Sequence, residues 1–210
     1  MVKQVETPPK APARVPRSRA KVGHPTKESR QQALSDVRRS LILDAARAVF
    51  FEHGLEGTSV REIARRAGYT PGAIYSYFAS KEEVYGALLS ESLDRLNAQV
   101  DAANKSAEDS PKEVVHRTAE AFFGFYCENP RDLDLGFYLF QGMQPRGLTP
   151  ALNERLNERL RASLSHAQEA MTTLGMKPDE ALAEVTALFV HAVGLLVLSN
   201  TGRIKMFKQG

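Results

Sequence analysis

Residues 58–83 read TSVREIARRAGYTPGAIYSYFASKEE, and this stretch decides the fold of the first part of the chain. Ser59 and Glu62 have the spacing of a capping box, in which each side chain binds an exposed backbone N–H group. A short helix is therefore predicted to follow Ser59. Gly68 ends that helix, because glycine adopts the left-handed conformation of a helix C-terminus at little cost.

A second short helix follows the turn at residues 67–70. This turn has the length that sets two helices at about 90–120° in a helix-turn-helix. Thr70 caps the second helix, and Pro71 takes the first-turn position that proline prefers. Ile74 and Phe78 lie four residues apart and face the core together. The other positions carry small or hydroxylated side chains, so the outer face is slim enough for a DNA major groove about 12 Å wide.

The rest of the chain shows helical patterns and no strand patterns. Apolar residues recur at three-and-four spacing up to Gly54, which predicts a helix over 34–53, an earlier start being the alternative. A second capping box at residues 80–83 begins a long helix. Breaks at Pro111, Pro130, Pro150 and Pro178 divide the remainder of the chain. The predicted helices are 81–104, 111–128, 131–142, 150–174 and 178–200.

The charge is unevenly distributed. Residues 1–39 contain ten lysines and arginines against three acidic residues, a net +7, whereas the remaining residues carry −4 of the total of +3. Residues 1–25 hold five of the eleven prolines and almost no large apolar side chains, so they are expected to be disordered or extended. A basic arm on a mildly acidic body favours a polyanionic partner bound at one end, and a solvated tail is the alternative.

The composition argues against several protein classes. No stretch supplies the roughly 18–20 charge-free apolar residues that cross a bilayer, and 181–198 is interrupted by polar side chains, so a buried helix and no membrane contact are expected. The N-terminus lacks the apolar core of a secretory signal, and the single Cys127 fits a reducing cytoplasm. Phosphate-loop, nucleophile-elbow and metal-ligand spacings are absent, so no catalytic residue, metal site or cofactor is predicted.

The stretch from Leu43 to Leu88 resembles the DNA-binding domain of TetR/AcrR-type transcriptional regulators. The matching residues are Ala45, Ala46, Phe50, Gly54, 58–64, Ala67, Gly68, 74–78, Lys81 and Glu82. The resemblance implies an all-α fold: an N-terminal three-helix helix-turn-helix domain followed by a larger helical ligand-binding and dimerisation domain. We place a basic arm at 1–33, the DNA-binding domain at 34–85 and the effector-binding and dimerisation domain at 86–210.

The resemblance also implies which residues contact DNA. The predicted set is Ser59, Arg61, Thr70, Pro71, Gly72, Ala73, Tyr75, Ser76, Tyr77 and Lys81. Arg61 would pair with a guanine edge or a phosphate. The alternative is that Arg61 is a solvated surface arginine. Lys81 would hold a phosphate at a helix N-terminus. Tyr77 would contact phosphate and Tyr75 would lie nearer the bases; packing of one of them is the alternative.

The arm is expected to reach a neighbouring minor groove. Arg14, Arg17, Arg19 and Lys21 lie on extended backbone just before the domain, and narrow A·T tracts attract arginine.

The second half is expected to bind an effector and a second copy of the chain. Phe122, Phe123, Tyr126, Phe137, Tyr138 and His191 are the predicted lining of an apolar pocket for a small ligand, the alternative being ordinary core. Residues 187–198 are apolar nearly all round, so this helix must be buried on most sides. A homodimer through the last two long helices is predicted.

These observations predict a cytoplasmic, nucleoid-associated, sequence-specific regulator that binds palindromic double-stranded operator DNA. Repression relieved by a small apolar or aromatic ligand is the expected mechanism. An activator or a ligandless regulator of the same fold is the alternative. A further alternative is a sequence-independent DNA-binding protein, whose affinity would depend strongly on salt and not on the base sequence.

Overall fold

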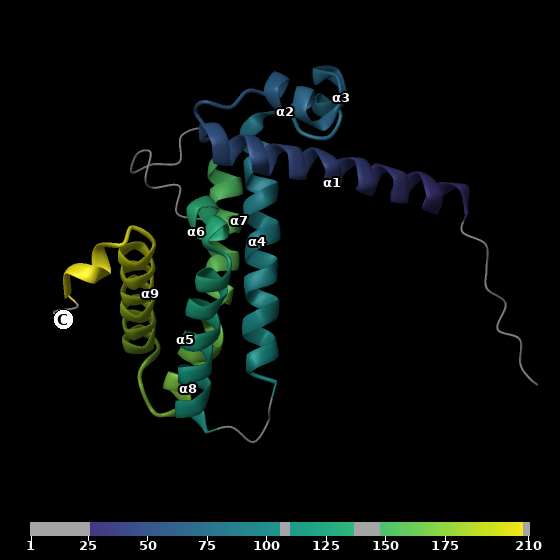
Figure 1. The fold of residues 1–210 in the computed structure, drawn as a ribbon. Helices are drawn as coiled ribbons and strands as arrows, with labels where there is room; N and C mark the ends of the chain where they lie inside the picture. Colours follow the sequence, from purple (N-terminus) through teal and green to yellow (C-terminus); the bar gives the residue numbers. More distant parts are fainter. Residues whose placement is uncertain (1–25, 106–109, 137–147, 208–210) are drawn as a thin grey trace, which may run out of the picture. The chain divides into compact units, whose positions relative to one another are not determined.

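The computed structural model describes residues 26–105, 110–136 and 148–207, and this part of the chain contains helices and no strand (Figure 1). The elements are α1 Lys27–His53, α2 Val60–Ala67, α3 Pro71–Tyr75, α4 Lys81–Ala103, α5 Pro111–Glu128, α6 Pro130–Gly136, α7 Pro150–Ala162, α8 Ser165–Thr173, α9 Pro178–Asn200 and the 3₁₀ helix η2 Arg203–Phe207. The predicted all-α class is confirmed. The chain divides into Met1–Asp36 and Val37–Gly210, and all features described below lie in the second unit unless stated.

Local chemistry explains where the helices begin. Proline is the first residue of α5, α7 and α9, as the sequence predicts, and also of α6, which begins one residue earlier than predicted; the missing N–H of proline is unpaired there in any case. Ser110 forms a complete capping box with Glu113: its hydroxyl accepts from the Glu113 amide, and the Glu113 carboxylate accepts from the Ser110 amide at 2.8 Å. The predicted helix ends at 53, 128 and 200 are confirmed.

Three helix predictions need correction. α1 begins at Lys27, so residues 27–33, assigned to the arm, are helical. The helix expected over 150–174 is two helices: the chain leaves helical geometry at Leu164, and next to this break the buried Ser163 hydroxyl donates to the Leu160 carbonyl at 2.7 Å. The helix expected over 131–142 is α6, Pro130–Gly136, and residues 137–142 lie outside the described part.

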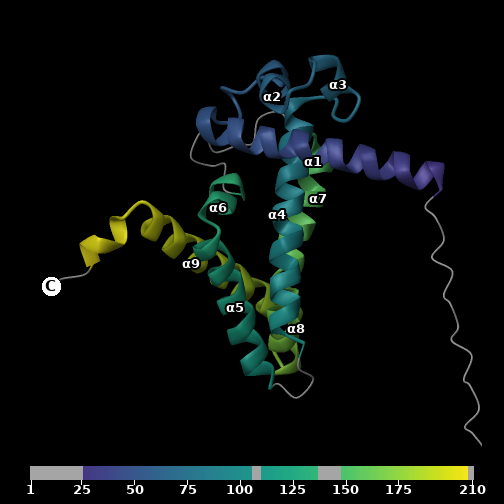
Figure 2. The same cartoon turned by 45° about the vertical axis from the view of Figure 1, so that its right-hand side comes forward.

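One hydrophobic core runs through residues 42–196, and α4 is its central member. α4 packs against α5 and α7 (Figure 2). The approach to α7 is close: a Cβ on Gly86 would lie 2.6 Å from Leu152 Cδ2. The predicted domain boundary at 85–86 thus falls inside a continuous helix, so the DNA-binding and effector parts share α4.

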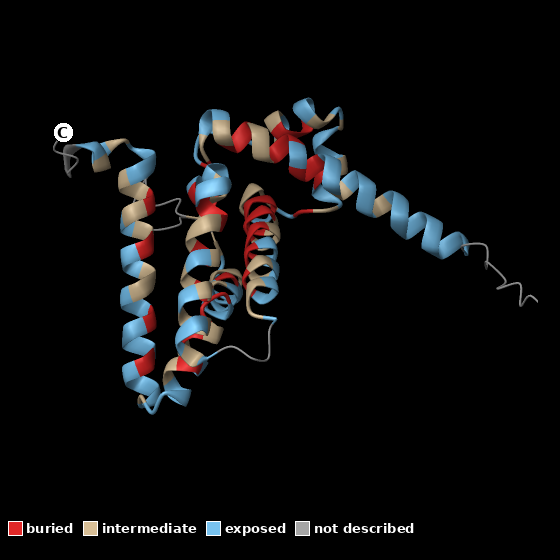
Figure 3. Cartoon of the chain, turned by 60° about the horizontal axis from the view of Figure 1, so that its bottom comes forward, coloured by how far each residue is buried: buried red, intermediate tan, exposed pale blue. Residues whose placement is uncertain are grey.

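α9 is much less buried in the single chain than its sequence predicts. Its buried residues Ala181, Val185, Ala192 and Leu196 follow one side of the helix (Figure 3). Val190 on another side is 62% exposed and Leu182 is 49% exposed. The single chain therefore buries one side of this helix, and the burial predicted for its other sides, against a second copy, stays a prediction.

Candidate nucleic-acid interface

The turn between α2 and α3 has the predicted construction. Gly68 has φ 73°, in the left-handed region, and Tyr69 N–H donates to the Ala64 carbonyl at 2.9 Å. Thr70 then caps α3, its hydroxyl accepting from the Ala73 amide at 3.2 Å. Ile74 is fully buried, so the outer side of α3 faces solvent.

The start of α2 follows the prediction only in part. The Ser59 hydroxyl accepts from the Glu62 amide at 3.2 Å, as expected. The Glu62 carboxylate does not return to Ser59 and instead accepts from Arg65 Nε at 3.2 Å. The capping box is therefore half formed, because a guanidinium one turn later is the stronger partner. This bond lowers the pKa of Glu62 and raises the pKa of Arg65.

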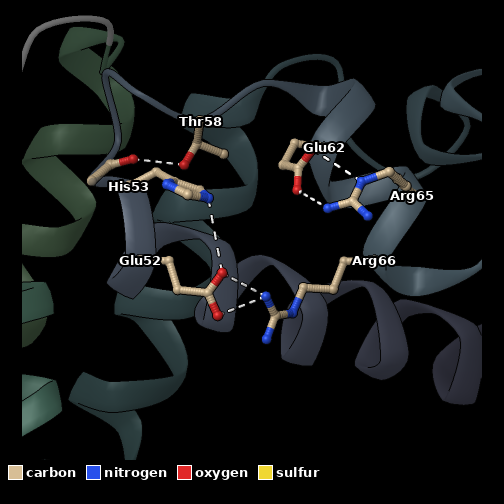
Figure 4. A network of polar contacts seen from close by, with 7 residues as sticks. Glu52, His53, Thr58, Glu62, Arg65 and Arg66 are labelled. Carbon is tan, nitrogen blue, oxygen red and sulfur yellow. Dashed lines mark hydrogen bonds and ion pairs between the residues drawn. The ribbon is translucent and has the colours of Figure 1, made fainter.

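Two of the three arginines on α2, Arg65 and Arg66, bind carboxylates (Figure 4). Arg65 is held by Glu62, and Arg66 Nη1 donates to both carboxylate oxygens of Glu52 in α1 at 2.7 Å. Arg61 is exposed and has no hydrogen bond or ion pair within the described residues. Of the three, Arg61 alone presents its whole guanidinium to a ligand, which agrees with the base- or phosphate-binding role predicted for it.

The surface of α3 beside Arg61 is small and hydroxylated. Pro71, Gly72 and Ser76 are exposed. The Thr70 hydroxyl uses its oxygen for the cap, which leaves its proton for a phosphate. The Ser76 hydroxyl donates to the Ala73 carbonyl at 2.7 Å and keeps its lone pairs. This face therefore offers both kinds of hydrogen-bonding group and little bulk.

Tyr75 and Tyr77 point in different directions, as residues two apart in a helical turn must. Tyr75 is 56% exposed. Tyr77 is half-buried and packs against the core next to Phe78. Tyr75 is thus the tyrosine on the exposed surface, and the packing alternative applies to Tyr77.

The ammonium of Lys81 binds the turn between α1 and α2. Its ammonium donates to the carbonyls of Leu55 at 2.7 Å, Thr58 at 3.0 Å and Glu56 at 3.4 Å. A lysine has three protons, and each has an acceptor in the α1–α2 turn. Phosphate binding by Lys81 stays a prediction, and in this structure its ammonium is held by the turn.

The remaining predicted residues belong to the arm and to the predicted pocket. Arg14, Arg17, Arg19 and Lys21, with Phe137 and Tyr138, fall outside the described residues. His191 is exposed on α9, so its assignment to a pocket is wrong: it lies off the side of α9 that faces the core.

The predicted aromatic set is partly assembled. Phe122 and Tyr126 are buried with ring centroids 5.3 Å apart, and Phe123 is half-buried. Phe189 of α9 packs on Phe122 at 5.9 Å, a member that sequence reasoning missed because it comes from a distant helix. Burial raises the pKa of Tyr126 above its ordinary value. Within the described residues, no group of three metal-ligating side chains exists.

Residues 42–88 match the sequence model described as "Bacterial regulatory proteins, tetR family". Residues 42–88 are therefore of the TetR type. This match covers α2, α3, the second part of α1 and the beginning of α4, which are the elements that build the surface around Arg61.

Curated transcriptional regulators match part of the chain. The HTH-type transcriptional activator FasR of Mycolicibacterium smegmatis is 37% identical over 90 residues, 43% of this chain and 41% of FasR. The HTH-type transcriptional repressor KstR2 of Mycobacterium tuberculosis is 48% identical over 62 residues, 30% of this chain and 31% of KstR2. The chain thus spans less than half of the length of these relatives.

Solved TetR-family structures share the fold over most of the chain. PfmR of Thermus thermophilus is 25% identical, with a TM-score of 0.59 over 81% of this chain and 85% of PfmR. FadR of Bacillus subtilis, solved in complex with stearoyl-CoA, is 21% identical, with a TM-score of 0.61 over 81% of this chain and 89% of FadR. The second comparison concerns the fold alone.

Proposed function

We propose that this chain is a sequence-specific DNA-binding transcriptional regulator of the TetR family that acts on a palindromic operator. The observation that carries the proposal is the unpartnered guanidinium of Arg61 beside the slim, exposed face of α3. Arginine pairs in two-pronged fashion with guanine O6 and N7, and the neighbouring hydroxyls position the helix on phosphates. Arg65 and Arg66 direct their hydrogen bonds to Glu62 and Glu52, so they support the domain.

The second part of the proposal is a two-fold dimer through α9 and its neighbour α8. Val190, Ala187 and Gly194 are exposed on the side of α9 away from its buried residues. A second copy would cover this apolar side by the same residues, as two-fold symmetry requires. Such a dimer would present two recognition helices about 34–36 Å apart, one turn of DNA.

The same helix is long and apolar enough to cross a membrane by length and composition, with 22% of the apolar window buried. We assign its exposed side to a partner subunit, because Glu184, Thr186 and His191 are also exposed along it. Charged and polar groups are costly in hydrocarbon but common at the rim of a protein interface. The proposed location is the cytoplasm, on the nucleoid while DNA is bound.

The third part is control by a small apolar ligand bound near the aromatic cluster of Phe122, Tyr126 and Phe189. These rings join α5 to α9, and α5 also packs on α4, which continues from the DNA-binding end. A ligand that binds one arrangement of these helices better than another shifts DNA affinity, typically by about 1–3 kcal/mol. FadR in complex with stearoyl-CoA is a solved example of a ligand-bound neighbour.

The test is selection of bound sequences from random DNA, followed by affinity measurement on the recovered site with and without a series of apolar ligands. A palindrome with half-sites about one helical turn apart supports the proposal. Recovery of unselected DNA, with affinity that collapses as salt rises, contradicts it. A reporter gene placed behind the site then shows whether the protein activates or represses transcription, since FasR is an activator and KstR2 a repressor.

A further inference from the structure

A cleft with a volume of about 410 Å³ lies where α7 packs against the first part of α4 (Figure 2). Its lining comes from α1, from residues 77–78 after α3, from α4, and from α7 with the preceding Thr149. All of the lining residues lie in the unit Val37–Gly210. This α4–α7 cleft is separate from the aromatic cluster of Phe122, Tyr126 and Phe189, with which it shares no lining residue.

A sequence repeat in α7 gives the cleft a basic side. Residues 152–160 read LNERLNERL, so leucine, glutamate and arginine each recur after four residues. Residues four apart on a helix lie one above the other. Arg155 and Arg159 therefore share one side of α7 next to Leu152 and Leu156, and all four line the cleft. The two glutamates of the repeat are exposed and are not part of this lining.

The two arginines of α7 have only one carboxylate partner between them. Arg159 Nη1 donates to the Asp94 carboxylate of α4 at 3.2 Å. Arg155 is exposed and has no hydrogen bond or ion pair within the described residues. Like charges four residues apart on a helix repel each other and destabilise it. An anion bound by both guanidinium groups would offset this repulsion.

α1 contributes a third arginine to the lining. The Arg39 guanidinium lies 5.2 Å from the centre of the Phe78 ring, and its Nη1 is 3.7 Å from the Glu91 carboxylate, too far for a hydrogen bond. Glu83 is the carboxylate among the lining residues, and it accepts from the Ala79 amide at 2.8 Å. The lining thus carries three positive groups against one negative group, which favours an anion.

The rest of the lining is apolar or hydroxylated. Phe78 and Leu156 are almost fully buried, and Leu152 is half-buried beside them. Thr149 and Ser90 add hydroxyl groups. Small-molecule sites combine apolar walls with a few polar or charged groups, and arginine binds a carboxylate through two parallel hydrogen bonds. This lining therefore fits a carboxylate that carries an apolar body better than it fits a bare inorganic anion or a neutral molecule.

The cleft also adjoins the helix that is proposed to enter the major groove. Tyr77 and Phe78 connect α3 to α4, and both line the cleft. The Phe78 N–H donates to the carbonyl of Ile74, the buried residue of α3, at 3.0 Å. A ligand in contact with Phe78 and Arg155 would link α7 to the end of α3. Ligand and DNA would then be coupled, because each favours the arrangement of these elements that it binds best.

We propose that the α4–α7 cleft binds a small organic carboxylate with an apolar body, held by Arg155 and Arg159, and that this binding changes the affinity for DNA. The binding step is independent of the proposed function, whereas its effect on DNA rests on that function.

The experiment titrates the full chain with phenylbutyrate, with its neutral analogue phenylbutanol and with inorganic phosphate, using calorimetry. The variants are Arg155→Gln and, as the matched control, Arg161→Gln. Arg161 is an exposed arginine in the last turn of the same helix and does not line the cleft. A third variant, Ala87→Leu, fills the cleft from α4 without changing its charge. Thermal unfolding shows that each variant is folded.

Phenylbutyrate is expected to bind the unmodified chain about tenfold or more tightly than phenylbutanol or phosphate, because it satisfies both the arginines and the apolar wall. Arg155→Gln should weaken phenylbutyrate about tenfold, Ala87→Leu should weaken it at least as much, and Arg161→Gln should leave it unchanged. Equal affinity in Arg155→Gln and Arg161→Gln overturns the site. Phosphate binding as tight as phenylbutyrate binding, or no phenylbutyrate binding, overturns the assigned ligand class.

The effect on DNA is measured with the selected operator and saturating phenylbutyrate. A change in operator affinity of about 5–150-fold is expected in the unmodified chain and in Arg161→Gln, and little change in Arg155→Gln. An operator affinity that is the same with and without bound phenylbutyrate overturns the regulatory part. If the unmodified chain selects no operator, the proposed function fails, and the titrations still decide whether the cleft binds a carboxylate.

Discussion

Helix α3 has five residues and α9 has twenty-three, yet within a single chain the shorter helix has the more complete set of capping bonds and buried contacts. α3 has its cap at Thr70, a left-handed glycine before it and the fully buried Ile74 beneath it. α9 is apolar along most of its length but buries only one side. Local bonds thus complete the helix-turn-helix, whereas α9 leaves an apolar side exposed in the single chain, and we propose that a second copy covers it.

The largest expected effect comes from placing a charge on the exposed side of α9. Val190→Glu would bury a carboxylate without a partner in the proposed dimer, a penalty of about 3 kcal/mol or more and on the order of 100-fold in the dimer dissociation constant. Sedimentation of the purified protein measures it. Leu34→Glu, at a similarly exposed apolar residue of α1 in the first unit, is the control and should stay dimeric. A Val190→Glu protein that remains dimeric would show that α9 is covered in another way.

The second-largest expected effect is a difference in operator affinity between variants of two arginines of α2. Arg61→Met is expected to weaken operator binding by about 1–3 kcal/mol per half-site and to relax the base preference at one position. Arg65→Met should change binding far less, because its guanidinium is occupied by Glu62. Competition binding against single-base variants of the operator measures both. Equal losses for the two variants would mean that Arg61 acts only through its charge.

A pair of glycines tests how tightly the DNA-binding end is built. Gly57→Ala places a Cβ against the His53 carbonyl and should cost about 1–3 kcal/mol, which lowers the melting temperature by about 2–4 °C per kcal/mol. Gly72→Ala meets nothing closer than Thr70 Oγ1 at 4.0 Å and should leave stability unchanged or raise it by up to about 1 kcal/mol. Calorimetry gives both values. Weaker operator binding by a stable Gly72→Ala protein would further show that DNA approaches this backbone closely.

The smallest expected effect concerns the ion pair between α1 and α2. Glu52→Gln removes the carboxylate that holds Arg66, and both side chains are more than a third exposed. Solvent screening limits the cost to about 0.2–1 kcal/mol in urea unfolding. A double-mutant cycle with Arg66→Met isolates the pair. A coupling well above this range would make the α1–α2 connection as important as the caps.

Local sequence determined most of the DNA-binding end. Ser59, Gly68 and Thr70 act on neighbours within five residues, so their patterns specify the turns and the helix starts before any tertiary contact forms. The proline-led starts of α5, α7 and α9 were readable for the same reason. The exposed character of Arg61 also followed from its place on the polar side of α2.

Tertiary structure decided the features that depend on partners distant in sequence. The Lys81 ammonium binds carbonyls more than twenty residues away, and Phe189 joins the aromatic cluster from another helix. The break between α7 and α8 occurs at Leu164, where the sequence has no proline or glycine to indicate it. The sequence of α9 shows that the helix needs burial, but the choice of buried side depends on how α5 and α8 pack against it. The pattern of apolar residues shows that a helix must bury one or more sides, whereas the residues that cover those sides are known only from the folded structure.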